Sequence, residues 1–147
     1  MTQNLNQFEL SPEIGDAFFS PYEGLPTFRL VKTSVNTLTS GDFVKVVNGD
    51  SIGMVDCEKI AALTDSVNGM VIRSINQKTF KAGEEVTVAC GGVYVWLMAD
   101  EEIDAGSDVM AVIGSAGHIV EKSSSNTVIG IAMKHASAGE LLPVKLV

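Results

Sequence analysis

The sequence predicts an all-β protein, with a compact body of β-barrel, tulip-like or sandwich form and an extended N-terminal arm. Past about residue 28, the apolar residues fall in short runs close to the common strand length of ~5 residues. Val and Ile dominate these runs, as is typical of strands, and Gly, Asn, Asp and Ser interrupt them. Short strands, frequent turns and almost no helical period together indicate a sandwich or a barrel.

The arm comprises residues 1–28, and its composition differs from that of the body, residues 29–147. It holds four acidic residues and no Lys or Arg, five of the nine aromatic residues, and three of the four prolines. Proline at this density blocks long helices and central strands. A short helix is expected to begin with Ser11 as N-cap and Pro12 at the first helical position, and to end before Pro21. We interpret the arm as a segment that packs on another surface.

Ten strands are expected beyond the arm boundary. They are Phe28–Lys32, Phe43–Val47, Ile52–Val55, Met70–Ile75, Val86–Cys90, Val93–Met98, Val109–Ile113, His118–Glu121, Val128–Met133 and Leu141–Val147. Tight turns are expected at residues 48–50, 91–92 and 115–117, where Gly, Asn and Ser gather. One short stretch, Cys57–Leu63, is compatible with a helix.

A short motif occurs four times in the body: a small residue, a glycine and polar residues lead into an apolar run. The copies are Ser40-Gly41-Asp42-Phe43-Val44, Ala82-Gly83-Glu84-Glu85-Val86, Ala105-Gly106-Ser107-Asp108-Val109 and Ala138-Gly139-Glu140-Leu141-Leu142. Glycine at this place allows a turn with positive φ that directs the chain into the next strand. Because the intervals are unequal, the motif excludes a solenoid or a propeller and indicates repeated strand starts within one β domain.

Length and charge limit the class of protein further. A chain of 147 residues is the size of one ordinary domain. The net charge of −8 and the absence of any Lys/Arg cluster argue against nucleic acid and anionic membranes as partners. The negative net charge is consistent with a basic protein partner, or it serves solubility alone. We find no secretory signal and no apolar run of ~20 residues, so we expect a soluble protein made in a cytoplasm.

The residues that carry most enzymatic chemistry are sparse. Cys57 and Cys90 are expected to be free thiols, although one bridge between them is possible. The apolar strand before Cys90 favours a raised thiol pKa over an activated nucleophile. His118 and His135 lie in no metal-ligand spacing and are expected in surface turns.

The densest charge cluster is acidic and lies between two expected strands. It consists of residues 100–102, Asp104 and Asp108, whose oxygens could bind Ca²⁺. The spacing is not that of an EF-hand loop, so a solvated loop is expected. No phosphate loop and no G-x-S-x-G motif is present, and the body is poor in the aromatics of a sugar-cleaving site. We predict no catalytic residues, no metal and no cofactor, and therefore no enzyme.

From about Leu38 to Val147 the chain resembles the decoration, or structural cement, proteins of tailed phages. The resemblance rests on the order of several fragments. They are residues 40–46 (SGDFVKV), 81–88 (KAGEEVTV), 91–95 (GGVYV), 103–106 (IDAG), 126–132 (NTVIGIA) and 141–146 (LLPVKL). Residues 1–37 show no such likeness.

The resemblance implies a β-barrel-like or tulip-shaped body without an active site. It also implies a place on the outside of the capsid within the virion, with the major capsid protein as partner and commonly a homotrimer. Two other classes remain open from the residues: a β-sandwich module of a head fibre or surface protein that binds a receptor or glycan, and a small enzyme whose site forms between subunits.

Four aromatic side chains of the arm are the candidate partner-binding residues: Phe8, Phe18, Phe19 and Tyr22. Burial of one aromatic side chain contributes roughly 1.5–3 kcal/mol, so this many are not expected to remain in water. Prolines reduce the entropy that the arm loses when it docks on a partner. The alternative is that the arm folds back over its own body as ordinary core.

Overall fold

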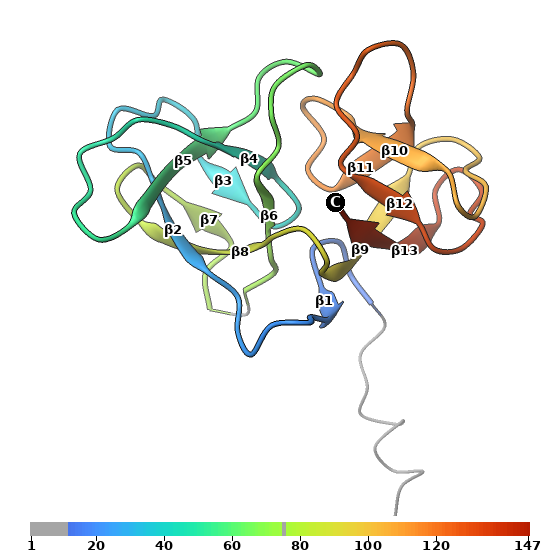
Figure 1. The fold of residues 1–147 in the computed structure, drawn as a ribbon, viewed down its shortest axis with the longest axis horizontal. Helices are drawn as coiled ribbons and strands as arrows, with labels where there is room; N and C mark the ends of the chain where they lie inside the picture. Colours follow the sequence, from blue (N-terminus) through green and yellow to red (C-terminus); the bar gives the residue numbers. More distant parts are fainter. Residues whose placement is uncertain (1–11, 75) are drawn as a thin grey trace, which may run out of the picture.

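The computed structural model describes residues 12–74 and 76–147, and within them it contains strands and no helix. The strands form two barrels that lie side by side, with the C-terminus between them (Figure 1). The first barrel and the short ladder beside it contain β2 (Thr27–Leu30), β3 (Leu38–Thr39), β4 (Phe43–Val46), β5 (Val55–Lys59), β6 (Gly69–Val71), β7 (Thr79–Phe80) and β8 (Glu85–Ala89). The second contains β9 (Tyr94–Ala99), β10 (Asp108–Ala111), β11 (His118–Glu121), β12 (Gly130–Ala132) and β13 (Leu141–Leu146), and β1 (Ala17–Phe19) lies along it.

Both barrels have the same five-strand topology. The first closes in the order β2-β5-β4-β6-β8. The second follows the order β9-β11-β10-β12-β13 and closes because β13 also pairs with β9. One pairing in each barrel is parallel: β2 with β5 in the first and β9 with β11 in the second. Every other pairing is antiparallel.

The likeness of the two barrels extends to single hydrogen bonds. The N–H of Leu30 donates to the carbonyl of Glu84 at 2.9 Å, and at the same place in the second barrel Ala99 donates to Glu140 at 2.9 Å. The return bonds, from Gly83 to Leu30 and from Gly139 to Ala99, are both 2.7 Å long. The β3–β7 ladder, where Leu38 pairs with Phe80, corresponds to the bridge between Ile103 and Ala136. The chain therefore contains one small barrel twice.

The four glycine motifs occupy equivalent places in this duplication. Gly41 and Gly106 precede the second strand of each barrel, whereas Gly83 and Gly139 precede the last strand. All four have a positive φ between 86° and 90°, a conformation that glycine adopts without the steric cost of a Cβ atom. The unequal intervals in the sequence arise because the loops within the two barrels differ in length.

The apolar core joins the barrels into one unit. The first barrel encloses one cluster of its own, built around Leu30, Val44 and Val88. The second cluster fills the second barrel and extends to Phe43 and Met70 of the first. Side chains at the start of β4 and in β6 thus bury apolar surface against the neighbouring barrel, which ties the two barrels together.

The predicted all-β class is confirmed, three local predictions need correction, and two short strands were not predicted. The expected helix at Cys57–Leu63 is wrong, because Val55–Lys59 is strand β5, paired on both sides, with Cys57 in the core. The expected helix after Ser11 is wrong over the described residues, which form β1 instead. The strand expected at Ile52–Val55 begins only at Val55, and Ile52 is 99% exposed. The two-residue strands β3 and β7 are too short to give a periodic signal.

Candidate docking surface

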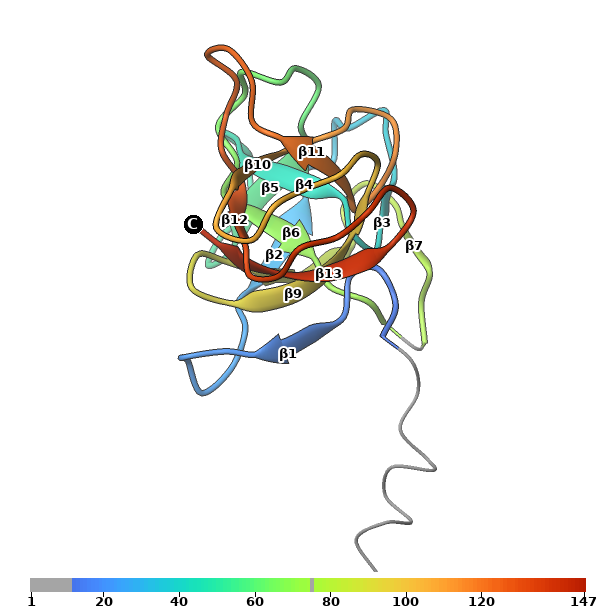
Figure 2. The ribbon, with the colours of Figure 1, turned by 90° about the vertical axis from the view of Figure 1, so that its right-hand side faces the viewer.

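Strand β1 attaches the N-terminal segment to the second barrel. Ala17 pairs with Val95 and Phe19 with Tyr94, and a β-bulge lies between the two pairs. Ahead of the strand, the N–H of Gly15 donates to the carbonyl of Trp96 at 3.0 Å, and the N–H of Trp96 donates to Asp16 at 2.9 Å. Within residues 12–74 and 76–147, β1 has no second strand neighbour in the sheet, and it lies on the outside of the molecule (Figure 2).

Five aromatic side chains gather where β1 meets β9, and we call them the aromatic patch: Phe18, Phe19, Tyr22, Tyr94 and Trp96. The ring of Phe18 lies 5.8 Å from that of Tyr94 and 5.4 Å from that of Trp96, and Phe19 lies 5.4 Å from Tyr94. These are ordinary separations for attractive edge-on ring contacts. The Tyr22 hydroxyl donates to the carbonyl of Gly91 at 2.9 Å.

The patch is held in place but not covered. Phe18 is 50% exposed, Phe19 55% and Tyr22 53%. The strand pairing of β1 holds the backbone of Phe18 and Phe19, and the bond to Gly91 holds the Tyr22 hydroxyl, so the rings are ordered before a partner binds. A pre-ordered apolar surface loses little entropy when it binds a partner.

Of the four predicted binding residues, Phe18 and Phe19 meet on the ring of Tyr94, and Tyr22 is anchored at Gly91, just ahead of β9. Phe8 lies outside the described residues. Neither Tyr94 nor Trp96 is among the predicted partner-binding residues. Both alternate with the buried Val95 and Leu97, but all of these residues are apolar or aromatic, so the alternation alone does not tell which face of the strand is outward.

Residues 13–16 connect this region to both barrels. The N–H of Arg73, after β6, donates to the carbonyl of Gly15 at 2.8 Å, and its Nε donates to Asp16 Oδ1 at 2.6 Å. The hydrogen bond to Asp16 is the main reason why the pKa of Arg73 is raised. On the other side, Gly15 and Asp16 bond to Trp96. This segment therefore fixes the patch relative to the first barrel as well as the second.

Ile14 fills a slot between the barrels that is lined by two glycines. A Cβ atom on Gly41, in the first barrel, would lie 2.8 Å from Ile14 Cγ2 and 2.8 Å from Gly117 Cα. A Cβ atom on Gly117, in the second barrel, would overlap Ile14 Cγ2. Only residues without a side chain allow the backbones and Ile14 to approach this closely.

The duplication shows that the apolar surface is not a requirement of the fold. Four outward positions on the first and last strands can be compared between the barrels. The first barrel has Thr27, Arg29, Glu85 and Thr87, and the second has Trp96, Met98, Leu141 and Pro143. The same face is thus polar in one barrel and apolar in the other.

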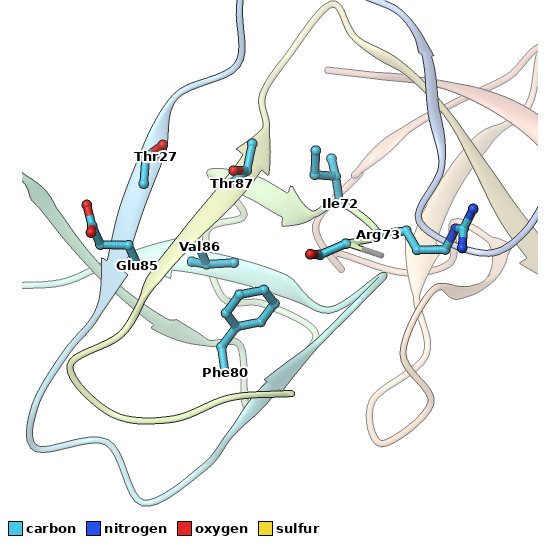
Figure 3. A pocket seen from close by; sticks show the side chains of 8 residues that line it. Thr27, Ile72, Arg73, Phe80, Glu85, Val86 and Thr87 are labelled. Atoms are coloured by element: carbon cyan, nitrogen blue, oxygen red, sulfur yellow. The ribbon is translucent and has the colours of Figure 1, made fainter. Parts of the chain in front are cut away.

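On the first barrel this polar face borders a hollow of about 440 Å³ (Figure 3). In the described part of the chain, its only aromatic lining residue is Phe80, which is 5% exposed and offers no open ring face for a sugar to stack on. Arg73, at one end, is already paired with Asp16. The hollow therefore gives little support to a glycan-binding module.

The thiols are poor nucleophiles. Both cysteines are free; burial, with the charges of Asp56 and Glu58, raises the pKa of Cys57 to about 11. Burial also raises the pKa of Cys90. A thiol with a raised pKa is protonated near neutral pH and is not activated for attack.

The buried carboxylates are structural. Asp42, 3% exposed, accepts hydrogen bonds from the N–H of Thr39 at 2.7 Å and from its hydroxyl at 3.2 Å. Asp56, 5% exposed, accepts bonds from Ser51 and from Arg29 Nε at 2.9 Å. Each is satisfied by its own loop or barrel, so neither is poised as a general acid or base.

The fold and the surface define the class: a small all-β protein of two like barrels that exposes an aromatic face. The chain belongs to the phage cement protein family, whose model matches residues 23–146. It is therefore a structural, capsid-associated protein of the virion, located on the capsid exterior.

The solved structures of similar fold include that of the N base of head fiber gp8.5 in bacteriophage phi29. It is 20% identical, with a TM-score of 0.50, and the match covers 82% of this chain and 91% of that one. A search of curated proteins finds no match. Among the described residues, no helix is long and apolar enough to cross a membrane.

Proposed function

We propose that the protein stabilises the capsid by binding the outside of the major capsid protein lattice through the aromatic patch. The observation that supports this is the half-exposed aromatic cluster on a face that the sister barrel keeps polar. Because the first barrel folds without apolar residues there, the aromatics of the second are free to serve binding.

The energy of such docking comes mainly from the rings. Burying one aromatic side chain contributes roughly 1.5–3 kcal/mol, and a ligand that binds only the assembled lattice stabilises that lattice by its binding free energy. Many copies on one shell add these contributions. The net charge of −8 favours basic groups on the facing capsid surface.

We infer that the functional unit is a homotrimer. The family resemblance supports this, as does the exposed edge of β1, since closed rings remove free strand edges. Sedimentation of the free protein is expected to give a trimer at micromolar concentration. A monomer both free and on the capsid would contradict it.

In this proposal the arm ahead of β2 acts as a strap that presents its aromatics to the lattice, whereas Phe28, the last residue of the predicted arm, lies in β2 and in the core of the first barrel. Removal of residues 1–11 tests the contribution of Phe8 to capsid binding, because β1 and its hydrogen bonds remain. Weaker capsid binding by a folded, shortened chain supports a role for Phe8 beside the patch.

The test of the patch is the double variant Phe18→Ala, Phe19→Ala. Both rings are half exposed, so the variant is expected to fold, and its binding to undecorated capsids, measured by co-sedimentation, should fall by about 100-fold or more. Ile52→Ala, at a fully exposed position of the first barrel, is the matched control and should bind as the parent does. Unchanged binding of the folded double variant would refute the proposal.

A further inference from the structure

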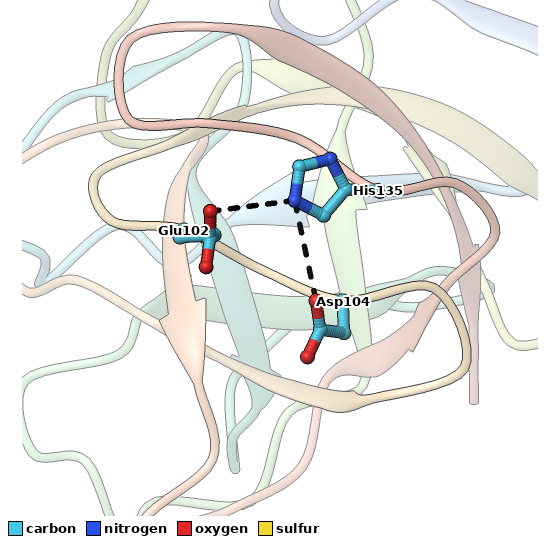
Figure 4. A group of neighbouring side chains, drawn as sticks. All are labelled: Glu102, Asp104 and His135. Carbon is cyan, nitrogen blue, oxygen red and sulfur yellow. Dashed lines mark ion pairs between the residues drawn. The ribbon is translucent and has the colours of Figure 1, made fainter.

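Three side chains of metal-ligating type meet at the bridge between Ile103 and Ala136. The two residues exchange backbone hydrogen bonds of 2.9 Å each, and both side chains are buried. Neighbouring side chains along an extended chain point to the opposite face. Glu102, Asp104 and His135 accordingly project together into solvent (Figure 4).

The distances suit closure around one ion. His135 Nε2 lies 3.6 Å from Glu102 Oε2 and 4.0 Å from Asp104 Oδ1, and all three ligand atoms lie within 4.8 Å of one another. A tetrahedral ion with bonds of about 2.0–2.2 Å needs its donors roughly 3.3–3.5 Å apart. The three side chains are at least half exposed, so small rotations bring them to this spacing without any change of the backbone.

The backbone that carries the ligands is fixed independently of any ion. Besides the Ile103–Ala136 bridge, the N–H of Asp104 donates to Glu121 Oε1 at 3.2 Å. Glu102 and Asp104 lie in the β9–β10 loop, whereas His135 lies in the β12–β13 loop. An ion held by all three would cross-link two loops that are far apart in the sequence.

The sister barrel provides an internal comparison at these three positions. Around the equivalent bridge, where Leu38 pairs with Phe80, the first barrel has only threonines, namely Thr37, Thr39 and Thr79. The fold therefore needs no charged or imidazole side chain here. The second barrel nevertheless has three metal-ligating side chains at the three positions.

We propose that Glu102, Asp104 and His135 bind a divalent transition-metal ion of the Zn²⁺ class. A set of one imidazole and two carboxylates suits zinc better than calcium or magnesium, which prefer oxygen ligands alone. Three protein ligands leave a fourth position open to water or to a donor on a bound partner. The proposal replaces the expectation from sequence, which treated the acidic loop as solvated and His135 as isolated.

The test uses the full chain and the fact that it has two histidines. Zn²⁺ is titrated while the imidazole resonances of both histidines are followed by NMR. The signal of His135 should move with a stoichiometry of one ion per chain, whereas that of His118, beside Asp100, should not. Zn²⁺ should also raise the Tm of the parent protein.

Matched variants decide between this site and binding elsewhere. His135→Gln, and separately Glu102→Gln with Asp104→Asn, should weaken Zn²⁺ binding at least tenfold, and His118→Gln should leave it unchanged. Glu102, Asp104 and His135 are exposed and His118 is partly exposed at the start of β11, so the variants are expected to fold. No shift of His135 at millimolar Zn²⁺, or equal affinity of the parent and His135→Gln, would overturn the proposal.

Discussion

The two barrels share their strand pairings and yet present different surfaces. On the first barrel, Arg29 forms ion pairs with Asp50 and with Asp56, its partner on the neighbouring strand. The positions of Arg29 and Asp56 are occupied on the second barrel by Met98 and His118. Thr27 likewise corresponds to Trp96. What the barrels have in common is what the fold requires, namely the inward apolar residues and the turn glycines. What differs between them is available for function.

A change at the junction between the barrels should have the largest effect on stability. Gly117→Ala forces a Cβ atom into Ile14 at a φ of +72°, and we expect it to lower the free energy of unfolding by about 3 kcal/mol. Urea denaturation measures this loss.

Gly139→Ala is the control for the junction, because its φ of +86° is similar and no atom lies within 4 Å of the added methyl group. It should cost only about 1 kcal/mol, from the backbone conformation alone. Equal losses for the two variants would show that Ile14 does not hold the barrels together.

Exchanging the equivalent residues on the two faces tests whether the patch is specific to the second barrel. Trp96→Thr gives the second barrel the residue of the first and should weaken capsid binding by about 10- to 100-fold, because one large ring is lost. Thr27→Trp, the reverse change, should not create a second binding face. If adding Thr27→Trp to the Trp96→Thr variant restored capsid binding, nonspecific hydrophobic binding would explain the data better than a defined patch.

The smallest effect concerns the ion cluster of the first barrel. A hydrogen bond from Arg29 is the main cause that lowers the pKa of Asp50. For Asp56, burial opposes the charged form, but hydrogen bonds from Ser51 and Arg29 outweigh it and lower the pKa as well. Groups with a lowered folded-state pKa stabilise the fold above their unfolded value of 3.8, and this contribution is lost as the pH falls through the folded value.

Arg29→Met therefore should lower the Tm by a few degrees near pH 7 and make the Tm less sensitive to acid below about pH 4. Thermal melts at several pH values, followed by circular dichroism, provide the measurement. A variant whose Tm falls with acid as steeply as that of the parent would show that Arg29 does not set these pKa values.

The sequence was sufficient for the fold class and for most strands of the body; the binding role that it suggests for Phe18, Phe19 and Tyr22 stays a prediction. It did not reveal the duplication, because the loops differ in length and equivalent positions often carry unrelated residues, such as Arg29 and Met98. It did not place Tyr94 and Trp96 on the surface either. Strand β9 is apolar on both faces, so its alternation does not tell which face is outward.

The trio at the Ile103–Ala136 bridge was missed for a different reason. Glu102 and Asp104 belong to one acidic loop, and His135 follows 31 residues after Asp104. Only the backbone pairing of two distant segments brings the imidazole to the carboxylates. No spacing rule for local metal motifs detects such a pair of segments.

Electron microscopy of a decorated capsid tests the central claim most directly. The account predicts that Phe18, Phe19 and Trp96 face the major capsid protein and that the polar face of Thr27 and Glu85 remains in solvent. A map in which the aromatic patch points away from the shell, with the first barrel seated on the lattice, would contradict the account.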